Sequence, residues 1–132
     1  MKARTILSSL FFLLLTSTWP LMAQDSYMFK HLDTKNGLSN SQVNYIFKDS
    51  KGFMWFGTAS GLNRYDGYNY KIFRHKESVG HSIADNFVDL IQEDADGNLW
   101  IHTGVGYVFF DSKKEVFVNN LAEIMKGFGI NH

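Results

Sequence analysis

Hydrophobic and polar positions alternate along this chain in short runs, and each run ends at a turn signal. The first clear run, Val43–Lys48, is rich in β-branched and aromatic residues, which is typical of a strand. It is followed by Asp49-Ser50-Lys51-Gly52. These four residues predict a tight turn. The aspartate side chain can accept hydrogen bonds from the backbone that follows it, and the glycine can adopt a positive φ. The alternation of strand and turn continues to residue 118 and predicts an all-β fold.

The predicted strands fall into two units of four. The first unit has Val43–Lys48, Phe53–Thr58, Leu62–Asp66 and Tyr68–Arg74, and the second has Val88–Glu93, Asn98–Thr103, Val105–Asp111 and Glu115–Val118. Four short antiparallel strands in about 45 residues match the size of one β-propeller blade. The sequence therefore predicts an incomplete propeller of about two blades, since closed propellers have roughly four to eight.

The two units repeat each other in sequence. At a spacing of 45 residues, Leu38–Asp66 aligns with Ile83–Asp111 without a gap and with eight identities in 29 positions. The signature residues are Asp49, Gly52, Trp55, Gly57, Thr58, Gly61 and Asp66 in the first unit, and Asp94, Gly97, Trp100, Thr103, Gly106 and Asp111 in the second. Residues that recur in one register favour structural roles. We therefore expect Trp55 and Trp100 to fill the space between stacked blades, although stacking on a sugar or base is the alternative for such tryptophans.

The segments outside the two blades also carry signals. Residues 27–31 (Tyr-Met-Phe-Lys-His) are similar to the fourth strand of the first unit, so we expect a lone outer strand there, of the kind that completes the last blade of a closed propeller. The predicted organisation is residues 24–37 as this strand and lead-in, 38–75 and 76–118 as blades, and 119–132 as a tail. Apolar spacing predicts one or two helical turns at Leu121–Lys126 in that tail.

The first 23 residues have the three parts of a secretory signal peptide. Lys2 and Arg4 form a basic start, Ile6–Leu15 form an apolar run, and Ala23 precedes the expected cut after Pro20 has ended the helix. An uncleaved membrane anchor is the alternative, but the run is shorter than the roughly 20 residues that a span needs. Cleavage leaves 109 residues with 11 basic and 13 acidic side chains, and predicts an exported protein.

Composition excludes several classes of function. Thirteen basic residues balance thirteen acidic ones, which gives no basic patch of the kind that binds nucleic acid. The chain has no cysteine, so disulfide scaffolds, thiolate metal sites and cysteine nucleophiles are excluded. Aromatic residues at 16% and eleven glycines indicate a folded, turn-rich domain. No cofactor is predicted.

Three kinds of chemical site are candidates in this sequence: a calcium loop, a zinc site made of histidines, and a loop that holds a nucleophile or a phosphate. Asp94-Ala95-Asp96-Gly97-Asn98 has oxygen ligands that calcium could use, but without the flanking helices and terminal glutamate of that motif a solvated turn is favoured. The five histidines are His31, His75, His81, His102 and His132. They lack the spacing of a zinc site. No nucleophile elbow or phosphate loop is present, and we predict no catalytic or metal-binding residue and no enzyme.

The first unit resembles the two-component regulator propeller repeat. The shared pattern is Asp-x-x-Gly, then aliphatic-Trp-x-Gly-Thr, then Gly-Leu-x-x-aromatic-Asp, and the resemblance spans residues 27–118. His102 and Tyr107 replace the usual Gly and Leu in the second unit. The opening Phe-Lys-His-Leu and Asn-Gly-Leu-Ser are similar to the start of the periplasmic sensor region of Bacteroides-type hybrid two-component regulators.

This resemblance implies a receptor. Such proteins place a periplasmic propeller before a membrane helix and a histidine kinase, and many respond to oligosaccharides. The expected partners are therefore the remaining blades and, in the full receptor, a glycan. The ligand-binding residues are unknown. Loops at Thr34–Asn40 and Glu77–Asp85 are the places where we expect a pocket.

Two alternatives stay open at this point. One is a truncated gene remnant without function, whose open strand edges would favour self-association. The other is a fragment of an exported propeller enzyme, a lyase or glycosidase, which rests on fold analogy alone.

Overall fold

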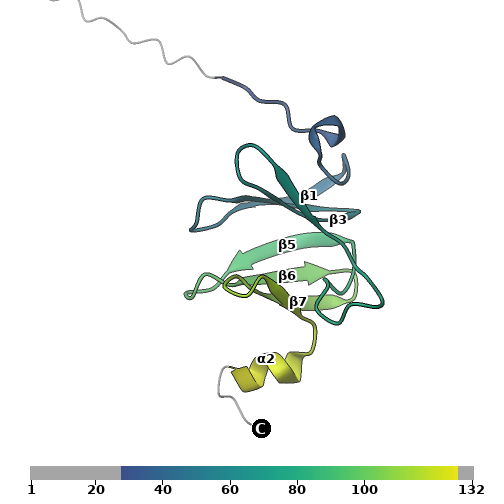
Figure 1. The fold of residues 1–132 in the computed structure, drawn as a ribbon, viewed down its shortest axis with the longest axis vertical. Helices are drawn as coiled ribbons and strands as arrows, with labels where there is room; N and C mark the ends of the chain where they lie inside the picture. The colour runs from purple at the N-terminus through teal and green to yellow at the C-terminus, as the bar shows by residue number, and fades with distance from the viewer. Residues whose placement is uncertain (1–27, 128–132) are drawn as a thin grey trace, which may run out of the picture. The chain divides into compact units, whose positions relative to one another are not determined.

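The chain folds into two four-stranded antiparallel sheets in a computed structural model that describes residues 28–127 (Figure 1). The first sheet contains β1 (Val43–Lys48), β2 (Met54–Thr58), β3 (Gly61–Tyr65) and β4 (Tyr70–Phe73) in that order, preceded by the 3-10 turn η1 (Thr34–Asn36). The second sheet contains β5 (Val88–Glu93), β6 (Leu99–Thr103), β7 (Gly106–Asp111) and β8 (Val116–Val118), followed by α2 (Leu121–Gly127). Within each sheet, neighbouring strands are consecutive in sequence, as the repeat predicts.

The strand boundaries follow from the turns between them. β1 and β5 have the predicted bounds, whereas β2 begins one residue late because the backbone of Phe53 is bonded in both directions to Asp49. β4 begins at Tyr70 because the Asp66 carboxylate accepts hydrogen bonds from the backbone N–H groups of Tyr68 and Asn69. Carboxylates that bond the next backbone groups compete with strand pairing and end the strand there.

The outer strand predicted before the first unit would pair with the last blade of a closed propeller, so it stays a prediction. Residues 28–31 have no strand pairing, and the side chains of Met28 and Phe29 are 95% and 93% exposed. A strand needs a hydrogen-bonded neighbour, and the four strands of the first sheet pair among themselves. The predicted signal peptide at residues 1–23 lies outside the described residues.

The predicted tail helix is confirmed as α2, whose Ile124 is buried. Within residues 28–127, no helix has the length and apolar character needed to cross a membrane.

The main core lies between the two sheets. The largest buried side chain, Trp55 on β2, stacks on Phe73 of β4 at 5.9 Å between ring centroids and meets the edge of Phe110 on β7 at 5.5 Å. The other fully buried members of this core are Leu62, Ile83, Val88, Ile91, Leu99, Ile101 and Val108. Since each sheet alone would expose this apolar face, the two sheets stabilise each other.

Trp55 fills the space between the two described sheets, whereas Trp100 does not lie there, and its place between blades stays a prediction. Side chains alternate across a strand, and on β6 Leu99, Ile101 and Thr103 take the buried positions toward the first sheet. Trp100 therefore lies on the opposite face, half buried against Phe109 at 5.2 Å. No sheet in the described part of the chain covers that face.

A smaller core lies on the other face of the first sheet. It joins Phe56 and Tyr65 to Leu38, which precedes β1, with the ring of Tyr70 4.7 Å from that of Tyr65. The lead-in before β1 thus covers the side of the first sheet that faces away from the second.

Substitution of the same residue type in two environments tests the location of the main core. Ile101→Ala, at a position with no exposed surface, should lower the free energy of unfolding by about 3 kcal/mol because it removes buried methylenes and leaves a cavity. Ile46→Ala, at a position that is 57% exposed, should change it by less than about 1 kcal/mol. Urea unfolding followed by circular dichroism measures both, and equal losses would contradict a core between the sheets.

Candidate functional site

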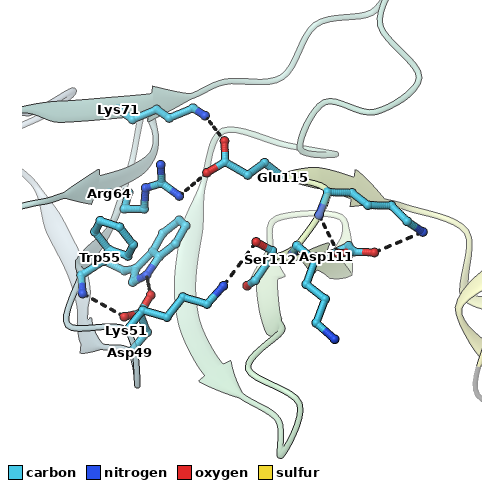
Figure 2. A network of polar contacts seen from close by, with 11 residues as sticks. Asp49, Lys51, Trp55, Arg64, Lys71, Asp111, Ser112 and Glu115 are labelled. Carbon is cyan, nitrogen blue, oxygen red and sulfur yellow. Dashed lines mark hydrogen bonds and ion pairs between the residues drawn. The ribbon is translucent and has the colours of Figure 1, made fainter.

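The first aspartate of each repeat holds the turn between the first two strands of its sheet. Asp49 accepts hydrogen bonds from the backbone N–H of Phe53 at 2.8 Å and, through its other oxygen, from the indole Nε1 of Trp55 at 2.7 Å (Figure 2). Asp94 accepts from the backbone N–H groups of Asp96 and Asn98, both at 2.9 Å. These bonds support the turn interpretation of Asp94–Asn98 over a calcium loop, because they use the carboxylate to fold the backbone.

The threonine of each repeat closes the next hairpin. Thr58 Oγ1 donates to the carbonyl of Gly61 at 2.8 Å, and Thr103 Oγ1 donates to the carbonyl of Gly106 at 2.7 Å. Both glycines have φ above 120°, a region that side chains rarely adopt.

The last aspartate of each repeat organises the turn before the outer strand. Asp66 accepts two backbone hydrogen bonds, from Tyr68 and Asn69, and Asp111 accepts two from Lys113 and Lys114. These bonds favour the charged carboxylate and lower the pKa of both groups. The signature residues described so far thus build turns.

A close backbone approach joins the two sheets where β2 ends. A Cβ atom on Gly57 would lie 2.8 Å from Cγ1 of Val88 and 3.0 Å from its carbonyl oxygen, so only glycine fits against β5. The same carbonyl accepts a hydrogen bond from Asn44 Nδ2 at 3.0 Å. Gly57 and Asn44 therefore fix how the second sheet sits on the first.

The β2–β3 turn contacts the first predicted loop and the residue that follows the second one. In the first loop, Asn40 Nδ2 donates to Ser60 Oγ at 2.8 Å. Just after the second loop, the carbonyl of Asn86 accepts from the backbone N–H of Gly61 at 2.7 Å. The structure therefore brings these loop ends to one side of the paired sheets, next to the hairpin turn.

The earlier part of the second loop runs beside β8. There the carbonyl of His81 accepts from the N–H of Phe117, and a surface cavity is lined by Arg74, Lys76, His81 and Glu115 among others. No residue of Thr34–Asn40 lines that cavity, and a pocket shared by the two predicted loops stays a prediction.

Ionic contacts join the sheets at the opposite end from that hairpin turn. Glu115, between β7 and β8, binds Arg64 Nη1 of β3 with one carboxylate oxygen at 2.6 Å and Lys71 Nζ of β4 with the other (Figure 2). Glu93 accepts from the N–H and the hydroxyl of Ser50, and Lys51 Nζ donates to the carbonyl of Ser112. Sequence reasoning missed this cluster because none of its charged residues belongs to the repeat signature.

His102 and Asp89 form a pair on the face of the second sheet that lies away from the first. His102 Nδ1 is 2.7 Å from Asp89 Oδ1, and the ring of Tyr107 meets the imidazole edge-on at 4.8 Å between centroids. The sequence singled out His102 as a break in the repeat but gave no partner for it.

The chemistry available in the described residues is that of packing and recognition. Among residues 28–127 no group of three histidine or carboxylate side chains is placed to hold a metal ion. Most of the polar side chains described above are bonded to turns, loop ends or the neighbouring sheet.

Comparison with known proteins agrees with this arrangement. Residues 37–60 and 82–104 match the family described as two component regulator propeller. Each matched segment runs from the lead-in of a sheet through its first two strands.

Two solved structures from B. thetaiotaomicron are similar. Both are extracellular domains of proteins described as hybrid two component systems. One has 30% identity and a TM-score of 0.63, the other 25% identity and a TM-score of 0.55, and each match covers 70% of this chain and 13% of the solved chain. A curated histidine kinase, P4, from Formosa agariphila is 42% identical over 65 residues, which are 48% of this chain and 5% of that kinase. The chain therefore spans only a small part of the length of its relatives.

Acid should weaken the ionic cluster at Glu115. The hydrogen bonds from Lys71 and then Arg64 hold the pKa of Glu115 at about 2, below its ordinary value of about 4.3. A lowered pKa in the folded state contributes stability at neutral pH that is lost as the pH falls from about 4.3 toward 2. Because the side chain is partly exposed, we expect Glu115→Gln to cost no more than about 1 kcal/mol at pH 7.

Urea unfolding at several pH values measures this effect. The difference between wild type and Glu115→Gln should shrink toward zero between pH 5 and pH 2. Glu77→Gln, in the exposed loop before β5, serves as the control and should match wild type at every pH. A difference at Glu115 that stays constant with pH would contradict the role of its charge.

Proposed function

Because the chain carries two repeats of the two component regulator propeller family, we propose that it is a non-catalytic segment of the exported sensor domain of a two-component receptor. The observation that carries the proposal is the packing contact between the two sheets. There Val88 of the second matched segment packs against Trp55 and Gly57 of the first. Repeats that pack on one another in this way build a larger domain, and the similar solved chains are much longer than this one.

The receptor's remaining blades are the partners that this segment needs. The small share of the relatives that is matched supports further sheets beside these two. We place the segment in the periplasm and its receptor in the inner membrane, on the basis of the N-terminal signal-peptide pattern and the extracellular relatives.

The ligand class proposed is an oligosaccharide, on the resemblance to sensors of Bacteroides-type bacteria. A ligand can signal only if it binds one arrangement of the sensor more tightly than another. The loop ends beside the β2–β3 turn, with Asn40, Ser60 and Asn86, offer amide and hydroxyl groups of the kind that bind sugar hydroxyls.

The reading frame of the gene tests whether the receptor exists. Sequencing genomic DNA through codon 132 and beyond should show further Trp-x-Gly-Thr repeats, a membrane span and a kinase in the same frame. A stop codon at position 133 followed by out-of-frame repeat remnants would contradict the proposal and leave a relic without a sensing role.

Signalling by the receptor tests the ligand class. A transcriptional reporter under its control should rise at least about tenfold with one oligosaccharide from a panel of polysaccharide digests, and not with the constituent monosaccharides. Asn40→Ala together with Asn86→Ala should reduce that response, whereas Asn69→Ala, in the exposed β3–β4 turn at the opposite end of the first sheet, is the control. A reporter that ignores every oligosaccharide but responds to another class of solute would exclude glycan sensing while leaving the sensor role intact.

A further inference from the structure

The loop that follows β4 is bonded both to itself and to the end of β8. The carbonyl of His81 accepts a hydrogen bond from the backbone N–H of Phe117 at 3.3 Å. The carbonyl of Ser82 accepts one from Asn119 Nδ2 at 2.9 Å. The hydroxyl of Ser82 accepts from the backbone N–H of Lys76 at 3.0 Å and donates to the Lys76 carbonyl at 3.1 Å. These bonds fix the shape of the loop and its place beside β8.

A cavity lies between this loop, β4 and β8. Its volume is about 190 Å³, and its apolar lining includes Phe73, Ile83 and Phe117. Pockets that enclose a drug-sized ligand have volumes of roughly 300–1,000 Å³. The cavity therefore suits a small ion, or one group of a larger ligand, and does not suit a whole oligosaccharide.

Three side chains with N–H donors line the cavity. Arg74 Nε donates to the carbonyl of Ser60 at 3.2 Å, which leaves both Nη groups of Arg74 without a bond in residues 28–127. Within the same range, Lys76 Nζ and the ring nitrogens of His81 have no hydrogen-bond or ion-pair partner. Since Arg74, Lys76 and His81 are all exposed, a dissolved ion can reach them.

The acidic residue in the lining does not neutralise these cations. Glu115 is the acidic residue among those that line the cavity, and its two carboxylate oxygens are bound by Arg64 and Lys71 of the first sheet (Figure 2). That cluster has two positive charges for one negative charge. The cavity thus combines unpaired N–H donors with a surplus of positive charge, and both favour an anion.

We propose that this cavity binds an oxyanion group, a sulfate or a phosphate. The planar guanidinium of Arg74 can donate to two oxygens of such a group at once, and Lys76 supplies a second positive charge. His81 adds a ring N–H donor. An inorganic ion and an acid group carried by a larger molecule share this chemistry. The inference does not depend on the proposed sensor role, because it concerns binding of the ion itself.

Titration of the ¹⁵N-labelled full chain with sodium sulfate tests the site. Sodium chloride is lowered in step, so that the ionic strength and the screening of surface charges stay constant. The amide signals of residues 76–83 and of β8 should shift along a saturable curve, whereas those of β1 should not move.

Variants matched in charge separate the cavity from the rest of the surface. Lys76→Gln removes a side chain charge that has no partner in residues 28–127, so the fold should be kept, and sulfate binding should weaken at least about threefold. Arg74→Gln together with Lys76→Gln should abolish saturation. Lys35→Gln together with Lys48→Gln removes two exposed positive charges that do not line the cavity, and should leave the curve unchanged.

A sugar sulfate ester, galactose 6-sulfate, distinguishes the two sources of the group, with galactose as the uncharged control. Shifts of the same amides with the ester indicate a group carried by a larger molecule, and shifts with inorganic sulfate alone indicate a free ion. Both results support the site. Shifts that do not saturate, or that are equal in the wild type and Lys76→Gln, would overturn it and leave the proposed sensor role intact.

Discussion

The approach of Val88 to Gly57 is the contact on which the rest of the structure depends. Each sheet has an apolar face that it cannot cover by itself, and Trp55, Phe73 and Phe110 meet only if the sheets come close. A side chain at position 57 would hold them apart, since its Cβ would lie within 3.0 Å of the β5 backbone. The glycine of the repeat thus permits the packing that its tryptophan stabilises.

Polar contacts at the two ends of this joint then fix its orientation. Apolar packing is non-directional, so it would tolerate some sliding or rotation of one sheet on the other. At the end of the sheets where β2 terminates, the hydrogen bond from Asn44 to the Val88 carbonyl fixes the position of one sheet on the other. At the opposite end of the sheets, the ion pair of Glu115 with Arg64 does the same. Directional bonds placed at both ends of an apolar layer give one arrangement rather than a set of similar ones.

The sequence predicted what depends on local structure and repetition. The strands and turns followed from residues such as Asp49 and Gly52, which act on their own neighbours in the chain. Trp100 and the segment at residues 28–31 could not be placed in this way, because burial and strand pairing depend on what lies beside them. Glu115 could not be found either, since an ion pair between residues 44 or more positions apart leaves no periodic signal.

The departures from the repeat carry information that the repeat itself cannot. If every sheet offered the same two faces, any sheet could stack on any other, and order within a propeller would rest on chain connectivity alone. Specific assembly requires contacts that reject the wrong neighbour as well as contacts that attract the right one. In the second sheet the counterparts of Asn44 and Gly57 are Asp89 and His102, and these two side chains contact each other, with His102 Nδ1 2.7 Å from Asp89 Oδ1. The residues that recur in both units therefore build the turns of each sheet, whereas the positions that differ give the two sheets different polar contacts.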